Sequence, residues 1–236
     1  MADAPTKRVP GHVQLSRELG IAIVTGDYQV GEILPGELDI ASRYGVSRSV
    51  VREALRMLSA RGLILSKPKT GTRVRPREDW HLLDPTLLEW MFEAAPPVDF
   101  VRALFELRLI VEPAAAELAA KKRSARQLSM LGHALEDMAE NKLSTERGRL
   151  ADQNFHAAIL EATDNELLVN LSASIGAAVR WTTHFKYRAK KKPLDSIEEH
   201  RRLFQAIADG DGDAARAATV DLIVKAEEDT RAALDA

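Results

Sequence analysis

The sequence contains no cysteine among its 236 residues. Disulfides, thiolate metal sites and a cysteine nucleophile are therefore excluded, and a cytoplasmic location is expected. No stretch approaches the roughly 18 consecutive apolar residues of a membrane helix, and residues 1–10 lack the apolar core of a secretion signal, so we expect neither membrane insertion nor secretion. Aromatic residues amount to only 5%, but the hydrophobic content of 45% is that of a globular protein.

The chain also lacks a strong net charge, since the total is only −2. The charges are unevenly distributed, however. Residues 1–78 carry 13 Lys and Arg against 8 Asp and Glu, whereas residues 79–236 carry 20 against 27. A basic N-terminal part followed by an acidic C-terminal part predicts that only the first part contacts phosphate.

The stretch that begins at Gly45 predicts a helix with one apolar and one cationic stripe. Arg48, Arg52 and Arg56 recur every fourth residue on one face. The apolar stripe consists of Val46, Val50, Val51, Ala54, Leu55 and Leu58. Ser47 is placed to cap this helix, and Gly45 to form the tight turn of a helix-turn-helix unit. An arginine stripe is also typical of a solvated helix face, so the interpretation depends on its neighbours.

Those neighbours favour a DNA-binding unit. Residues 37–44 predict a short preceding helix, with Leu38 among the residues expected to face inward. After the arginine helix, residues 63–66 and 73–75 read as short strands on either side of a basic turn. Helix, turn, helix and a two-stranded wing form a far more specific signal than any one of these parts.

At this point the residues resemble the GntR family of bacterial transcription regulators. The matching residues are Leu34-Pro35, Gly45-Val46-Ser47-Arg48, Val51-Arg52-Glu53-Ala54-Leu55, Leu58, Gly62-Leu63 and Gly71-Thr72. The resemblance covers about the first third of the chain and implies a winged helix-turn-helix domain. The family usually has a serine after Leu-Pro and an arginine two residues further on, where this chain has Gly36 and Leu38. A phosphate or base contact commonly supplied by that arginine is therefore absent.

This resemblance implies a double-stranded DNA partner. The candidate DNA-binding residues are Arg43, Ser47, Arg48, Ser49, Arg52, Lys69, Thr70 and Gly71. Arg48 and Arg52 are the candidates for guanine contacts in the major groove, whereas Arg43, Ser47 and Lys69 are better suited to phosphate. We expect a palindromic operator bound by a homodimer of matching symmetry.

From Pro97 onward the sequence shows helical periods and no strand alternation. The expected helices span residues 100–120, 124–140, 146–162, 166–188, 195–208 and 213–230, with a Lys/Pro-rich break at 189–193. The expected fold class is mainly α. It combines a winged helix-turn-helix domain over residues 1–77, a connector with a short helix over 78–96, and an all-helical bundle of six or seven helices over 97–236 that binds an effector and dimerises.

The second half is similar to the FCD effector-binding domain of the FadR-like branch of the same family. The matching residues are Arg108-Leu109-Ile110-Val111-Glu112-Pro113-Ala114-Ala115, Asp152-Gln153-Asn154-Phe155-His156, Glu199-His200 and Gly210-Asp211. Within that branch, the segment from Trp80 to Trp90 looks most like the regulators of galactonate operons and their sugar-acid-responsive relatives. The resemblance implies a repressor that releases its operator when a small carboxylate or sugar acid binds.

A metal site is the first chemical feature expected in the helical domain. Asp152 and His156 are four residues apart and so share one helix face, and His200 begins a different helix. Carboxylate and imidazole suit Zn, Mn, Ni or Fe better than Ca, and Zn is our expectation, although a surface pair would have the same spacing. The family commonly binds a divalent ion with an aspartate and three histidines; the fourth position falls at Leu222, which is no ligand. We expect three protein ligands with water or effector completing the shell, the alternative being loss of the metal.

Four further residues are candidates for the effector. Arg108 and Arg180 lie in otherwise apolar helical stretches, where an arginine facing the bundle core needs an anionic partner. That partner is either the effector or a buried carboxylate such as Glu112. Trp181 and His184 follow Arg180 closely and either close the pocket or belong to the core.

The competing function is a metal-dependent hydrolase tethered to DNA, because an ion with an open position can activate water. No general base is evident beside the three ligands apart from Glu199, which is expected to point elsewhere. We therefore predict a regulator and no enzymatic activity.

Overall fold

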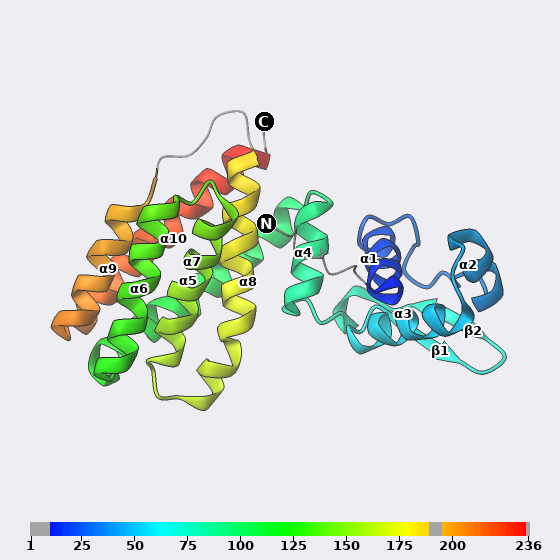
Figure 1. The fold of residues 1–236 in the computed structure, drawn as a ribbon, viewed down its shortest axis with the longest axis horizontal. Coiled ribbons are helices and arrows are strands. Elements are labelled where there is room, and N and C mark those ends of the chain that lie inside the picture. Colours follow the sequence, from blue (N-terminus) through cyan, green and yellow to red (C-terminus); the bar gives the residue numbers. More distant parts are fainter. Residues whose placement is uncertain (1–9, 189–194, 235–236) are drawn as a thin grey trace, which may run out of the picture. The chain divides into compact units, whose positions relative to one another are not determined.

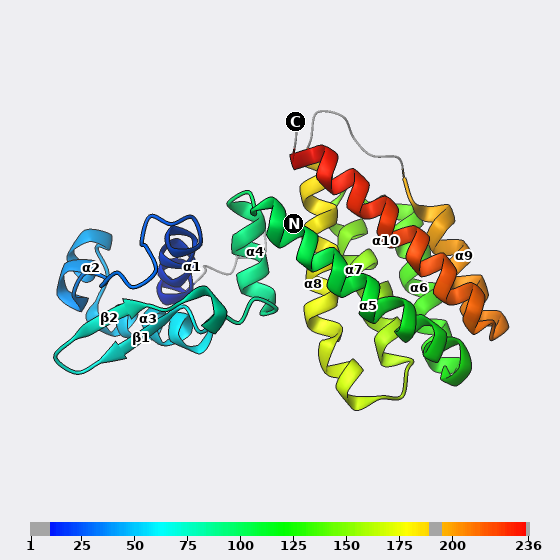
Figure 2. The same cartoon turned by 180° about the vertical axis from the view of Figure 1, so that it is seen from behind.

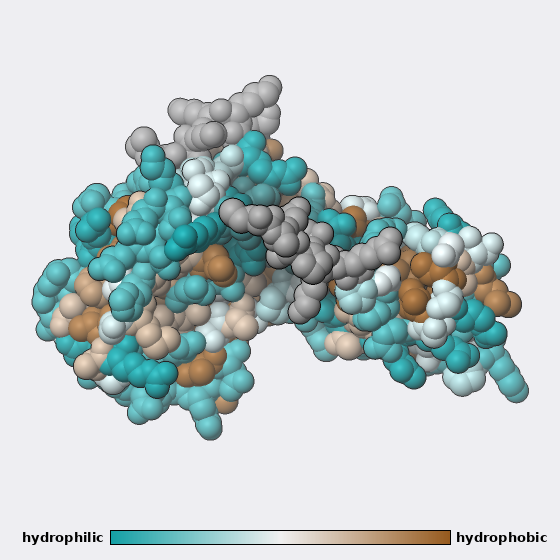
Figure 3. All heavy atoms as spheres, viewed as in Figure 1, coloured by the Kyte–Doolittle hydropathy of each residue, from teal (hydrophilic) through white to brown (hydrophobic). Residues whose placement is uncertain are grey.

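The computed structural model describes residues 10–188 and 195–234, and the chain divides into two compact units, Met1–Ala94 and Ala95–Ala236. The expected break at residues 189–193 lies outside the described residues. No helix in the described ranges is long and apolar enough to cross a membrane. Hydrophilic residues cover most of the face drawn in Figure 3, with smaller hydrophobic patches between them.

The first unit is a winged helix-turn-helix fold, as the sequence predicts (Figure 1). Its elements are α1 (Gly11–Val24), α2 (Glu37–Tyr44), α3 (Arg48–Ala60), β1 (Ile64–Lys67), β2 (Gly71–Val74), the 3-10 turn η1 (Arg77–Asp79) and α4 (Pro85–Glu93). Helix α3 packs against both α1 and α2. The two strands pair antiparallel, with Ile64 opposite Val74 and Lys67 opposite Gly71.

The turn between α2 and α3 has the expected chemistry. Gly45 ends α2 in the left-handed conformation, with φ of 62°, which glycine adopts without steric cost. Ser47 caps α3 by accepting a hydrogen bond from the backbone N–H of Val50 at 3.4 Å. The expectation for Leu38 is wrong, because this side chain is 64% exposed. Ile40 is the buried residue of α2, and a residue two positions away lies about 200° around a helix.

A third backbone segment completes the wing. The N–H of Leu34 donates to the carbonyl of Thr72 at 2.8 Å, and the N–H of Gly31 donates to the carbonyl of Val74 at 2.9 Å. These bonds attach the segment before α2 to strand β2. The segment is therefore paired along most of β2, from Val74 to Thr72.

Helix α4 belongs to the first unit and packs on α1. Asp84 caps it by accepting two backbone N–H bonds from its first turn, and also pairs with Arg61 at 3.1 Å. Trp90 is buried against Gly20, where an added Cβ would lie 2.3 Å from the indole ring. Trp80 is buried as well and donates its indole N–H to the carbonyl of Arg75 at 3.0 Å. The apolar stretch that the sequence assigns to a connector thus packs on the DNA-binding helices.

The second unit contains six helices in its described residues, within the expected range. They are α5 (Val98–Lys122), α6 (Ala125–Asn141), α7 (Glu146–Glu161), α8 (Glu166–Arg188), α9 (Ile197–Asp209) and α10 (Gly212–Leu234). Helix α7 packs against both α6 and α8, and α10 packs along α5 and α9 (Figure 2).

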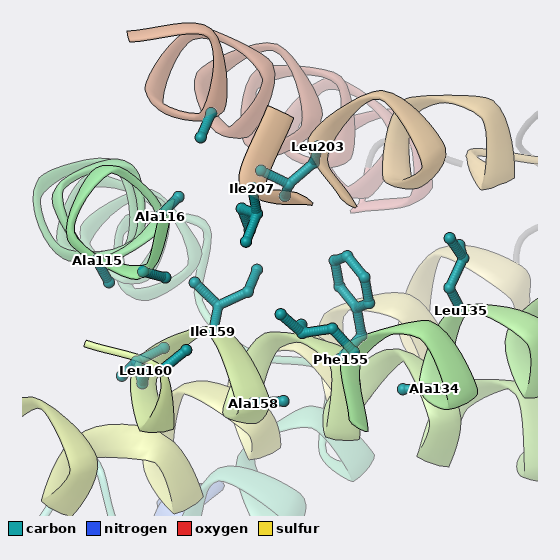
Figure 4. Packing of buried hydrophobic residues seen from close by; sticks show 14 of the residues in the cluster. Ala115, Ala116, Ala134, Leu135, Phe155, Ala158, Ile159, Leu160, Leu203 and Ile207 are labelled. Carbon is teal, nitrogen blue, oxygen red and sulfur yellow. The ribbon is translucent and has the colours of Figure 1, made fainter. Parts of the chain in front are cut away.

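The core of this unit is apolar where α5, α7 and α9 meet. Phe155 and Ile159 of α7 extend toward Leu203 and Ile207 of α9 (Figure 4). Farther along the same helices, the interior holds ionisable side chains instead. The buried ionisable residues of the second unit include Arg108, Glu112, Arg149, Asp152, His156, Lys186 and His200. Charged groups in a helical interior require partners, and those partners define the candidate site.

Candidate functional site

The arginine face of α3 is available to solvent. Arg48, Arg52 and Arg56 are all exposed, with 60% of the Arg52 side chain accessible. The opposite face buries Val51 and Leu58 against the rest of the unit. The helix therefore has the apolar and cationic faces that the sequence predicts.

Glu37 of α2 holds two of these arginines and was not anticipated from the sequence. Its carboxylate accepts a hydrogen bond from Arg52 Nε at 2.9 Å and lies 3.7 Å from Arg48 Nη2. Neither Nη group of Arg52 has a hydrogen bond within the described residues. The outer edge of the guanidinium is thus free to present two donors, which is the geometry that matches guanine O6 and N7. The Glu37 contact joins two different helices, so no local pattern could reveal it.

The wing carries three further candidates for DNA binding. Lys69 and Thr70 lie exposed in the turn between the strands, and Lys69 adopts a positive φ of 66°. Gly71 begins β2, also at a positive φ. Ser66 of β1 lines a hollow of about 350 Å³ together with Arg52 and residues of α2 and α3. The first wing strand therefore borders the arginine face.

The remaining candidates lie at or near the start of α3 and at the end of α2. Arg43 is exposed in the last turn of α2, with its guanidinium 5.7 Å from the centre of the Tyr44 ring. The hydroxyl groups of Ser47 and Ser49 are 2.8 Å apart and exposed at the N-terminus of α3. An exposed helix N-terminus with two hydroxyl groups beside it is suited to phosphate.

Asp152, His156 and His200 converge in the second unit. The first two come from successive turns of α7 and the third from α9, and one ligand atom of each lies within 4.8 Å of the others. His200 Nε2 is 3.1 Å and His156 Nε2 is 3.6 Å from Asp152 Oδ1. All three residues are buried. The structure thus brings together the three side chains that the sequence selected as metal ligands.

The second ring nitrogens show which atoms face inward. His156 Nδ1 lies 2.6 Å from Glu112 Oε2, and His200 Nδ1 lies 2.7 Å from the carbonyl oxygen of Ser196. Both partners accept hydrogen bonds, so each Nδ1 carries a hydrogen and each ring turns its Nε2 toward Asp152. Two imidazole nitrogens and a carboxylate oxygen thus face one another from two helices. This donor set therefore fits a divalent cation.

The two buried carboxylates are held in the ionised form. Burial by itself would raise the pKa of Glu112, but Arg108 and His156 outweigh that effect and lower the pKa to about 2. Burial would likewise raise the pKa of Asp152, but hydrogen bonding from His200 and the nearby positive charges lower it. Thr183 donates to Asp152 Oδ2 at 3.0 Å, which satisfies the second carboxylate oxygen. The site therefore combines two ionised carboxylates, Glu112 and Asp152, with cationic and hydrogen-bonding side chains that stabilise their charge.

Arg108 forms the buried ion pair that the sequence left open. Its Nε donates to Glu112 Oε1 at 2.6 Å, and the other oxygen of Glu112 receives the His156 bond. Arg108 also borders the cavity beside the three candidate ligands. One carboxylate thus orients both an arginine and a histidine of the site.

The cavity beside the three candidate ligands is small, with a volume of about 20 Å³, enough for one water-sized species. Leu222 of α10 lines it and contributes no ligand atom. Lys186 of α8, Lys225 and Asp229 of α10 also line it. The site is thus a small pocket of mixed charge.

Lys186 and Thr183 are site residues that the sequence reasoning missed. Lys186 is only 5% exposed, and its Nζ lies 3.9 Å from Asp229 Oδ2. Burial lowers the pKa of Lys186, an effect that Asp152 and Asp229 oppose. In the sequence, Lys186 stands among basic residues, a pattern that is typical of a solvated helix end. The helical spacing of Val179, Thr183 and Lys186 was the available signal.

The other effector candidates of α8 lie elsewhere. Arg180 is 31% exposed and pairs with Glu146, so the expectation that it faces the core is wrong. Trp181 and His184 stack edge to face at 5.3 Å, and burial together with Arg149 lowers the pKa of His184. None of the three lines the cavity. The cavity is lined by Val179, Thr183 and Lys186, which share a different face of α8. Glu199 is bound by Lys225, consistent with its expected direction away from the ligand cluster.

Comparison with known proteins gives two family matches. Residues 12–74 match the model of the bacterial regulatory proteins, gntR family, and residues 103–225 match that of the FCD domain. The chain is 34% identical over 206 residues to the galactonate operon transcriptional repressor of Escherichia coli K12, covering 87% of this chain and 90% of that protein. It is also 34% identical to the HTH-type transcriptional regulator YieP of the same organism, covering 85% and 87% respectively.

A solved structure of a Listeria monocytogenes protein, Lar, has the same fold. It is described by the words "Lar controls the expression of the Listeria monocytogenes agr system and mediates virulence", and it superposes with a TM-score of 0.69 over 96% of this chain and 99% of that one. At 18% identity this likeness concerns the fold alone. The matched families and relatives are transcription regulators, which confirms the prediction that the chain is not an enzyme.

Proposed function

The chain belongs to the gntR family of bacterial regulatory proteins and carries an FCD domain, and from this premise we propose that it represses a sugar-acid catabolic operon until a small carboxylate effector releases it. The buried cluster of Asp152, His156 and His200 carries this proposal. Its three inward-facing donor atoms would hold a divalent ion, most simply Zn²⁺, and leave a coordination position open. Such an ion supplies a direct binding point for a carboxylate or hydroxyl oxygen when it is present.

The effector class is inferred from the pocket and from one relative. Arg108 and Lys186 place cationic groups in the pocket wall, which favours an anion. The Escherichia coli relative is named for a galactonate operon, and galactonate is a sugar acid. We therefore propose a hydroxylated monocarboxylate as the effector.

The operator contacts are assigned to the first unit. Arg48 and Arg52 are proposed to read guanine in the major groove, while Arg43, Ser47, Ser49, Lys69, Thr70 and Gly71 position the phosphate backbone. A homodimer would place two such units on the half-sites of a palindrome. The exposed arginine face, supported by Glu37, is the structural basis of this assignment.

Release follows from thermodynamic linkage. An effector that binds better to the DNA-incompetent arrangement weakens operator binding by the ratio of its two affinities. No direct contact between effector and DNA is needed.

The test begins with selection of an operator from a random duplex library. Fluorescence anisotropy then follows release of that operator by galactonate, gluconate and lactate, with and without a chelator. We expect at least one acid to weaken operator binding by about 5- to 150-fold, with the effect reduced by the chelator. Unchanged operator affinity under an acid that calorimetry shows to be bound would contradict the proposal.

A further inference from the structure

Lys186 places a buried ammonium group in the same cavity as the candidate metal ligands. The side chain extends from the last turn of α8 and is 5% exposed, yet it lines the cavity. Asp152, His156 and His200 border that cavity from α7 and α9. Lys186 thus lines the same cavity from a third helix.

The protein provides no close hydrogen-bond acceptor for the ammonium group of Lys186 in the described residues. Its nearest carboxylate oxygen is Asp229 Oδ2, at 3.9 Å, beyond hydrogen-bonding distance. Throughout residues 10–188 and 195–234, no hydrogen bond is made by Lys186 Nζ. By contrast, Lys121 Nζ donates to Glu117 at 2.6 Å on the exposed face of α5. The ammonium therefore lines the cavity with three donors and no protein acceptor, so a ligand oxygen in the cavity can accept from it.

The other cations of the cavity are already committed. The Nε of Arg108 is bound by Glu112, and the Nζ of Lys225 is bound by Glu199. The candidate ligands are likewise tied to partners behind them. Of the cationic side chains that line the described cavity, Lys186 is the one without a close carboxylate.

We propose that Lys186 is an effector-binding residue whose ammonium donates to an oxygen of the bound carboxylate. This inference rests on the proposed function and adds the side chain that fixes the anionic end of the ligand. The ligand class is a small oxyanion, because the cavity admits a species of about the size of one water molecule without rearrangement.

Formate, the smallest carboxylate, is the probe that requires the least enlargement of this space. Binding is measured on the full chain, with Zn²⁺ present and chloride replacing formate at constant ionic strength. The two readouts are thermal stability and line broadening of ¹³C-formate. We expect saturable binding to the wild-type chain and a dissociation constant raised about 10- to 100-fold by Lys186→Met.

Lys121→Met is the matched control and should bind formate like the wild type. Failure of Lys186→Met to fold is covered by the wild-type chain labelled with ¹⁵N at lysine Nζ, in which formate should shift the Lys186 resonance and leave Lys121 unchanged. Equal formate affinity of wild type and Lys186→Met, or an unshifted Lys186 resonance at saturation, overturns the assignment but leaves the proposed function intact. Absence of binding by formate and by every acid of the operator-release panel overturns both.

Discussion

Glu37 limits the positions that Arg48 and Arg52 can take for their proposed contacts with DNA. Because its carboxylate holds Arg52 through Nε, this contact leaves both Nη groups available to a base edge. A flexible arginine would lose more side-chain entropy on binding. The structure therefore supports a reading role for Arg52 more directly than the helical spacing alone did.

The base-reading assignment predicts different outcomes for Arg52→Ala and Lys69→Ala. Loss of a bidentate guanine contact should remove about 1–3 kcal/mol of discrimination at one operator position. Loss of a phosphate contact should weaken all sequences alike and lower the salt slope by about one. Anisotropy titrations on the operator and on a scrambled duplex, at several salt concentrations, measure both effects. Equal losses on the two duplexes for Arg52→Ala would contradict its role.

Glu112 is expected to support metal binding without touching the ion. Its carboxylate accepts from His156 Nδ1 and so directs Nε2 toward Asp152. Replacement of such a supporting carboxylate typically weakens metal affinity about 10- to 100-fold, and we expect this for Glu112→Gln, measured by competition with a chromogenic chelator. Glu106→Gln, an exposed change on the same helix, serves as the control. Unaltered Zn²⁺ affinity in Glu112→Gln would argue against the orientation inferred for His156.

The residues that could be predicted are those whose relations lie within one helix or one family motif. Asp152 and His156 share a face by spacing, and Ser47 caps by position. Glu37 and Lys186 could not be predicted in the same way, because their roles depend on which helices pack together. Arg180 shows the converse, since an apolar neighbourhood in sequence proved to be a partly exposed position in the bundle.

At the scale of elements, the contact between α1 and α4 attaches the last helix of the first unit to the DNA-binding helices. Gly20 leaves just enough room for the indole of Trp90. We expect Gly20→Ala to destabilise the first unit by about 1–3 kcal/mol through overpacking, although alanine favours a helix by up to about 1 kcal/mol. Urea unfolding monitored by circular dichroism measures the change. Gly11→Ala on the same helix, where an added Cβ makes only ordinary contact, is the control.

If Gly20→Ala lowered the free energy of unfolding no more than the control Gly11→Ala does, the close packing of Trp90 would be contradicted. This packing could be anticipated only in part. Two tryptophans in one short segment indicated that the segment docks somewhere, but the surface it docks on depends on a glycine far earlier in the chain. The helix boundaries were easier to predict, because capping residues such as Ser124 and Asp84 mark them locally.

At the scale of the whole molecule, effector and operator binding must affect each other equally. If an acid weakens operator affinity by a given factor, saturating operator must weaken the affinity for that acid by the same factor. Isothermal calorimetry of the acid, with and without operator duplex, measures this factor and should return the value obtained from anisotropy. If operator affinity kept falling as the acid concentration rose, without reaching a limiting factor, the acid would be competing for the DNA-binding surface instead.

The three tryptophans are divided between the units in a way that makes each unit visible by its own emission. Trp80 and Trp90 are both enclosed in the N-terminal unit, whereas Trp181 is only partly covered in the helical bundle. With phenylalanine at position 181, fluorescence would report melting of the DNA-binding half alone. With phenylalanine at positions 80 and 90, the remaining indole would report on the sensing half, so the order in which the two halves come apart can be followed without any added label.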